Sequence, residues 1–117
     1  MDTDLLTAAR SLAERGWLPG IKYEMTPYGT ERMLILVEGS WMEGPSEAHL
    51  HLAAHNEIVR RKWFIAVDAL LQNTTSIDTE MFVTSPTVTE PGTTTLSLLR
   101  ALLAACEAAK SKEKNDG

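Results

Sequence analysis

Apolar residues recur at helical spacing near the start of the chain. Four of them follow the i, i+3, i+4, i+7 pattern of an amphipathic helix: Leu5, Ala8, Ala9 and Leu12. The pattern predicts a helix over residues 4–15, which Gly16 ends. Pro19 disfavours helix at the residue before it, so the chain is expected to turn there.

The spacing then changes to a period of two, which is typical of a half-buried strand. Ile21, Tyr23 and Met25 alternate with polar residues, so residues 21–28 are predicted to form a strand. Residues 32–38 are apolar on both faces, as in the central strand of a sheet. The turn sequence Pro-Tyr-Gly-Thr lies between the two runs and predicts a hairpin.

Residues 39–45 are predicted to form a loop, because glycines bracket them at both ends. Trp41 and Met42 lie inside this loop. Large apolar side chains exposed on loops often mark contact sites, so both are candidate partner-binding residues. The alternative is a loop that folds back over the core.

All three histidines lie in residues 47–55, a segment with two interpretations. With a period of two, His49 and His51 share one strand face; with a period of 3.6, His51 and His55 share one helix face. A third strand is the preferred interpretation, because apolar and polar residues alternate here. Asn56 would then be the N-cap of a new helix.

That helix is predicted over residues 56–73. One stripe would pack on the sheet: Val59, Trp63, Ala66, Val67 and Leu70. The opposite face carries Arg60, Arg61 and Phe64, and Glu57 can form an i, i+4 ion pair with Arg61. Arginines beside an aromatic residue are typical of interface hot spots, so these three residues are predicted to bind a partner. A solvated helix face is the alternative.

A fourth strand is predicted over residues 77–84 and a last helix over residues 95–110. The last helix is apolar on two adjoining stripes, one of which contains Cys106. So wide an apolar face must be buried inside the chain or by a second subunit, and the second option predicts a homodimer through the C-terminal helix. Residues 111–117 are rich in charge and are predicted to be a disordered tail.

These elements give an α+β fold of order αβββαβα, in which helices pack on a mainly antiparallel sheet. The 117 residues fit one domain, here residues 1–110. With 44% hydrophobic and 23% charged residues, the chain can bury a core without a metal or a disulfide, so no cofactor is predicted.

Charge and cysteine content narrow the function classes. The net charge of −5 argues against direct nucleic-acid binding, which needs clustered Lys and Arg. No apolar run is long enough to cross a membrane, and the acidic start of the chain is unlike a signal peptide. The single cysteine requires no oxidising compartment. The sequence therefore predicts a cytoplasmic protein.

Two groups of residues could carry chemistry. His49, His51 and His55, with a nearby glutamate, are of the type that binds zinc or iron, so a metal-dependent enzyme is the rival interpretation. The default interpretation is that the histidines form a polar surface. Cys106 lies on an apolar stripe, where a thiol is unreactive. A non-enzymatic protein is the prediction.

Two runs of the chain resemble pieces of short phage and prophage accessory proteins: Arg-Gly-Trp-Leu-Pro-Gly-Ile at 15–21 and Thr-Leu-Ser-Leu-Leu-Arg-Ala-Leu at 95–102. This resemblance implies a non-catalytic, anti-defence inhibitor in the host cytoplasm, and it carries over no site residue. The element order is also similar to that of type III secretion chaperones, which are dimeric α+β proteins. We predict a small binding protein that occludes a surface of a host protein complex, with the dimeric chaperone as an alternative.

Overall fold

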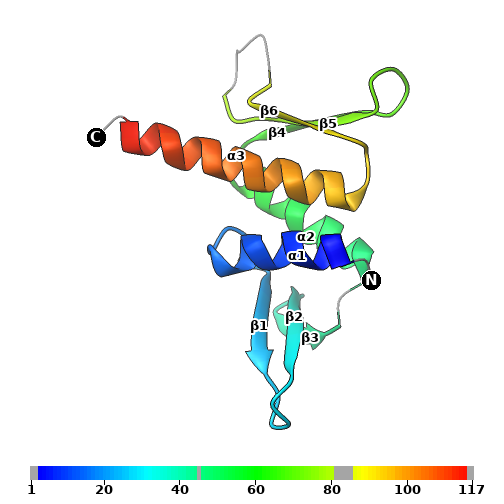
Figure 1. Ribbon diagram of the computed structural model, residues 1–117, viewed down its shortest axis with the longest axis vertical. Coiled ribbons are helices and arrows are strands. Elements are labelled where there is room, and N and C mark those ends of the chain that lie inside the picture. The colour runs from blue at the N-terminus through cyan, green and yellow to red at the C-terminus, as the bar shows by residue number, and fades with distance from the viewer. Residues whose placement is uncertain (1–2, 45, 81–85, 116–117) are drawn as a thin grey trace.

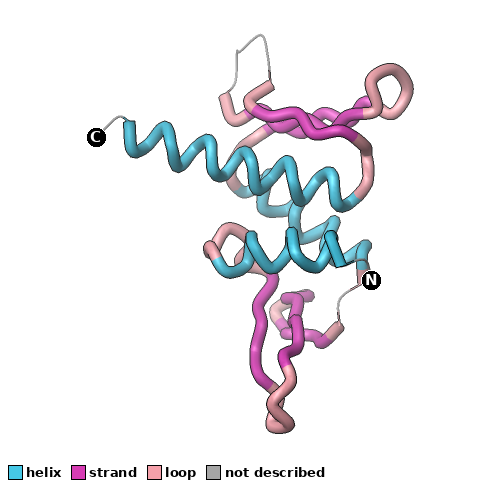
Figure 2. Tube along the Cα trace, in the orientation of Figure 1, coloured by secondary structure: helices cyan, strands magenta, loops and turns pink. Residues whose placement is uncertain are grey.

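Three helices form a layer between two antiparallel sheets in this computed structural model (Figure 1). The structure describes residues 3–44, 46–80 and 86–115, without the side chains of residues 112–115. The elements in chain order are α1 (Thr3–Glu14), β1 (Ile21–Met25), β2 (Glu31–Val37), β3 (Ser40–Glu43), α2 (Glu47–Arg60), β4 (Phe64–Asp68), β5 (Thr74–Asp78), β6 (Val88–Pro91) and α3 (Thr95–Asn115). Figure 2 shows the helices between the two groups of strands. The predicted α+β class, antiparallel pairing and alternation of helices with groups of strands are confirmed.

Sheet A consists of β1, β2 and β3, with β2 in the centre as predicted. The predicted hairpin is confirmed: Ile21 lies opposite Ile35, and Tyr23 lies opposite Met33. These four side chains face the core, where Ile21 and Ile35 are buried. Gly29, at φ +83°, makes the turn between the strands.

The loop predicted over residues 39–45 is wrong for most of its length, because residues 40–43 form β3 and pair with β2. Glu38 and Gly39 both have positive φ, as the central residues of a two-residue hairpin turn require. A glycine interpreted as a loop boundary is therefore the second residue of a tight turn. Pro45 lies outside the described residues.

The third strand predicted over residues 47–55 is also wrong, since this segment is the first part of α2. Ser46 caps the helix: its Oγ accepts a hydrogen bond from the His49 backbone N–H, and the Ser46 N–H donates to His49 Nδ1, both at 3.4 Å. The helix thus begins well before the predicted cap at Asn56. Its buried face contains Leu50, Ala54 and Ile58.

The helix predicted over residues 56–73 is correct only as far as Arg60. Lys62 has φ +62°, which ends the helix, and β4 begins at Phe64. The apolar and β-branched residues that follow suit a strand. The fourth strand predicted over residues 77–84 overlaps β5, which lies at Thr74–Asp78, and the part of the prediction at residues 81–84 lies outside the described residues.

Sheet B consists of β4, β5 and β6, and α3 packs against β5, β6, α1 and α2. Leu99, Leu102 and Ala105 of α3 are completely buried. Both apolar stripes of the last helix are therefore covered largely within one chain, and no second subunit is needed to explain them. The helix continues to Asn115, beyond its predicted end at Lys110.

Candidate protein-binding surface

The face of sheet A that points away from the core combines apolar and charged side chains. We call it the outer surface, and its solvent-accessible residues, which surround the buried Leu34, are Lys22, Glu24, Arg32, Leu36, Trp41 and Glu43. Strand alternation places all six on one face, opposite to Ile21 and Ile35. They come from all three strands, so sheet pairing positions the surface.

Leu36 and Trp41 form the exposed apolar part of the outer surface. They lie directly opposite each other on β2 and β3, and they are 44% and 40% exposed. The Lys22 ammonium lies 4.2 Å from the centre of the Trp41 ring, where a cation is attracted by the ring face. Trp41 is thus held between an aliphatic neighbour and a cation.

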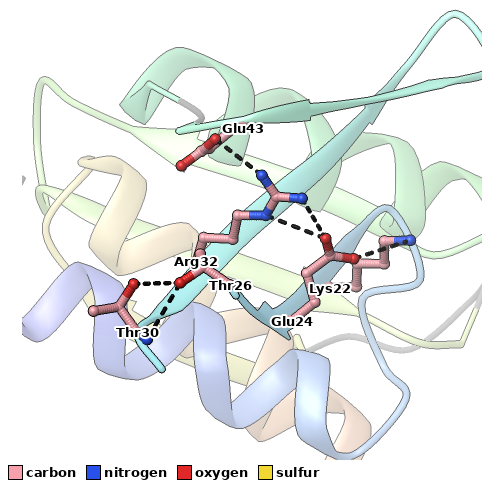
Figure 3. Close-up of polar contacts among 6 residues, drawn as sticks. All are labelled: Lys22, Glu24, Thr26, Thr30, Arg32 and Glu43. Carbon is pink, nitrogen blue, oxygen red and sulfur yellow. Dashed lines mark hydrogen bonds and ion pairs between the residues drawn. The ribbon is translucent and has the colours of Figure 1, made fainter. Parts of the chain in front are cut away.

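Ion pairs connect the charged side chains of the outer surface (Figure 3). Arg32 contacts the Glu24 carboxylate at 2.5 Å and the Glu43 carboxylate at 3.2 Å, and Lys22 lies 4.0 Å from Glu24. The hydrogen bond from Arg32 holds the pKa of Glu24 below its ordinary value, so the carboxylate is ionised at neutral pH. Because these groups are partly exposed, the pairs order the surface more than they stabilise the fold.

Of the two residues predicted to bind a partner from the loop, only Trp41 belongs to the outer surface. Met42 follows it on β3 and therefore points to the opposite face, where it lies opposite Ile35. Met42 is half exposed beside the core. The two neighbours in sequence therefore lie on opposite faces of sheet A.

Arg60 and Arg61 lie at the end of α2 and bind the carboxylate of buried Glu57. Arg60 Nη2 is 2.8 Å and Arg61 Nε is 3.1 Å from Glu57 Oε2, which confirms the predicted pair with Arg61. The Arg61 guanidinium also lies 5.0 Å from the centre of the Trp63 ring. Both arginines therefore have structural roles in the chain.

Phe64 lies on β4, half exposed, and not on the back of a helix as predicted. The five residues predicted to bind a partner thus fall into two groups. Trp41 and Met42 belong to sheet A, whereas Arg60, Arg61 and Phe64 lie where α2 meets sheet B, across the helix layer (Figure 1).

The three histidines do not converge. His49 belongs to the cap of α2, and about 200° of helix rotation separates it from His51. His51 and His55 line a cavity of about 230 Å³ together with Val67, Thr75 and the start of α3. In the described ranges, no group of three or more His, Cys, Asp or Glu side chains is arranged to hold a metal ion.

Cys106 is buried on α3, and burial raises the pKa of its thiol to about 11. Little thiolate is then present at neutral pH, as the apolar position in the sequence predicts for an unreactive cysteine.

Of the residues that form the outer surface, the sequence singled out Trp41 and missed the other five. Leu36 belongs to an apolar run that predicts burial on both faces, yet it is 44% exposed. The sequence of the hairpin contained evidence for a solvent-facing side, because the register set by its turn places Glu24 opposite Arg32. An opposite-charge pair across two strands marks a solvent-facing side.

No protein-family model, curated protein or solved structure matches the chain. None of the helices in the described segments is long and apolar enough to cross a bilayer.

Proposed function

We propose that the protein is a non-enzymatic binding protein that covers a surface of a partner protein with the outer surface of sheet A. The observation that carries this proposal is the Leu36 and Trp41 pair, which stays exposed while ion pairs order the charges around it. Tryptophan and arginine are enriched at the centres of protein interfaces. Side chains that are already ordered also lose less entropy on binding.

The expected partner site follows from the chemistry of the outer surface. An apolar pocket would receive Trp41, and burial of a large side chain of this kind contributes about 1.5–3 kcal/mol. Polar groups around the pocket would complement Lys22 and the ion pairs of Arg32. Binding then occludes the partner without any chemical step.

The resemblance of two segments to phage and prophage accessory proteins extends this proposal to a phage-type inhibitor of a host protein complex. Such an inhibitor needs only to bind its target and to cover the surface that the target uses. The outer surface offers both through side chains fixed on a three-stranded sheet.

Quantitative affinity purification from host cells tests the proposal, with the wild-type protein compared with the Trp41→Ala and Leu36→Ala variants. We expect recovery of the specific partner to fall by about tenfold or more with Trp41→Ala, because truncating a hot-spot residue costs about 2 kcal/mol or more and about 1.4 kcal/mol is tenfold in affinity. Met42→Ala is the matched control, since Met42 is the next residue on β3 but lies on the other face.

Circular dichroism verifies that each variant is folded. Equal recovery with Trp41→Ala and wild type, or an equal loss with Met42→Ala, would contradict the assignment of the outer surface.

A further inference from the structure

Strand β4 leaves one edge of sheet B open. The strand order is β4, β5, β6, so among the described residues β4 pairs only with β5. Its sequence Phe-Ile-Ala-Val carries no charge before Asp68. Soluble proteins usually protect such an edge with lysine, proline, a bulge or a cover, because unpaired N–H and C=O groups recruit another strand.

Two of the other terminal strands carry protecting residues: β1 has Lys22 and Glu24, and β6 has Glu90 and Pro91. Strands β3 and β4 each carry a charge only at the last residue, Glu43 and Asp68. Of these two, β4 is the longer and the more apolar, so it is the least protected of the four edges that the structure describes.

Exposed apolar side chains gather at this edge and at the turn that follows it. Phe64 and Val67 are about half exposed, whereas Leu70 and Leu71 in the turn are 95% and 89% exposed. Asp68 Oδ1 accepts hydrogen bonds from the Leu70 N–H at 3.2 Å and the Leu71 N–H at 2.8 Å. The turn is thus fixed with both leucines directed to solvent, an arrangement that suits an interface.

We propose that two copies of the chain pair through antiparallel β4 strands and join their sheets into one sheet of six strands. In this dimer the helices of both copies cover the same face of the sheet. Residues directly opposite each other in the two β4 strands must then lie on the same face of the sheet. A two-fold axis through Ala66 meets this requirement, and no other axis that does so pairs all five residues of β4.

The pairing makes the apolar groups on the helix side of β4 cover one another. Ile65 and Val67 point to the helix side, as do Ile77 and Thr75, which lie opposite them on β5 and are buried. With the axis at Ala66, Ile65 lies opposite the partner's Val67, so the half-exposed valines become covered.

Charge favours a second copy as the occupant and fixes its direction. The basic residues Arg60, Arg61 and Lys62 precede β4, whereas Asp68 ends it. With the axis at Ala66, Phe64 lies opposite the partner's Asp68, and Lys62, two residues before Phe64, lies diagonally across from that carboxylate. Parallel pairing would place the like charges side by side.

The dimer leaves the outer surface of sheet A free, because sheet A lies on the opposite side of the helix layer from sheet B (Figure 1). Each dimer would therefore present two outer surfaces. A contact made by one five-residue strand from each copy lies at the low end of specific interfaces in size. We therefore expect a dissociation constant of about 1–100 μM.

Sedimentation velocity between about 1 and 500 μM tests the proposal, a range that brackets the affinity expected of a small interface. The mass of the wild-type protein should rise towards twice the 12.9 kDa of one chain. Ala66→Lys places two like charges at the axis and should weaken the dimer by about tenfold or more. The control Met25→Lys, at an exposed position of edge strand β1, should dimerise like wild type.

Disulfide cross-linking tests the position of the axis. Facing residues in paired strands have Cβ atoms about 4.5–5.5 Å apart, so a modest shift lets the Ala66→Cys variant form an intermolecular disulfide under mild oxidation. Thr89→Cys, exposed on β6, is the control and should stay monomeric on a denaturing gel. Buried Cys106 does not interfere with either variant.

Three outcomes would each overturn the proposal. The first is a wild-type protein that stays monomeric at about 500 μM, a concentration far above the dissociation constant expected of such a contact. The second is a dimer that Ala66→Lys leaves intact, and the third is equal cross-linking at positions 66 and 89. Dimerisation through α3 would give the second outcome. Pairing of β4 with a strand of a different protein would give the first.

Discussion

Glu57 is the only charged residue that lies in the core among those described, with 4% of its surface exposed. Burial alone would raise the pKa of its carboxyl, but the hydrogen bonds and charges of Arg60 and Arg61 outweigh this effect. The pKa therefore falls below its ordinary value of 4.5. The two arginines predicted to bind a partner also keep this carboxylate ionised.

Acid should weaken the fold through Glu57. A carboxyl whose pKa is lower in the folded state stabilises the fold above its unfolded pKa, and this contribution disappears as pH falls through the folded value. We expect Glu57→Gln to lower the free energy of unfolding at pH 7 by about 1–3 kcal/mol. The difference from wild type should shrink below pH 4.5, the ordinary pKa of the group.

Urea unfolding at pH 7 and at about pH 3, below the ordinary pKa of a glutamate, measures this difference. Glu14→Gln is the matched control, because Glu14 also pairs with an arginine four residues away but is exposed. It should change stability by less than about 1 kcal/mol. A Glu57→Gln effect of the same size at both pH values would contradict the assignment.

At the scale of elements, the sequence predicted α1 and β1 because each has a single unambiguous period, and it predicted β2 because its apolar run suits a central strand. Residues 47–55 fit both the strand period of two and the helix period of 3.6, and the N-cap at Ser46 stabilises the helix. The apolar positions of residues 59–70 fit a helix equally well. The positive φ of Lys62 and pairing of β4 with β5 are properties of the folded chain that no local pattern contains.

The same reasoning explains why only part of the candidate site could be predicted. Trp41 was recognisable as a large apolar residue near glycines, but its partner Leu36 depends on the register between β2 and β3. Phe64 was predicted to be exposed, as it is, although on a different kind of element.

The junction between β6 and α3 depends on the absence of a side chain at Gly92. This glycine has φ +89°, and a Cβ there would lie 2.6 Å from Ser97 Oγ, which is itself hydrogen-bonded to the Pro91 carbonyl. We expect Gly92→Ala to destabilise the protein by about 2–4 kcal/mol, from backbone strain plus this collision.

Gly29→Ala is the matched control for thermal and urea unfolding. Gly29 has φ +83°, but nothing lies near the position of its added Cβ. Strain alone should then cost about 1–2 kcal/mol. Equal losses for the two variants would show that the contact with Ser97 is relieved by a small shift.

At the scale of the whole molecule, α3 is the element that connects α1 on one side with sheet B on the other. Leu102 is completely buried at this position. We expect Leu102→Ala to lower the free energy of unfolding by about 2–5 kcal/mol, because it leaves a cavity in the core.

Far-ultraviolet circular dichroism and tryptophan fluorescence should report one common transition for wild type and for Leu102→Ala. The control Leu70→Ala should change stability by less than about 0.5 kcal/mol, since Leu70 is almost fully exposed. Two separate transitions would contradict a single cooperative unit built around α3.

The chain passes from sheet A to sheet B once, through α2, and no strand of one sheet pairs with a strand of the other in the described residues. Surface substitutions on one sheet therefore leave the hydrogen bonding and side-chain packing of the other unchanged. The outer surface can acquire affinity for a new target by a few exchanges on β1 to β3. Meanwhile, β4 keeps its sequence, so the proposed partner binding and the proposed self-association can evolve independently.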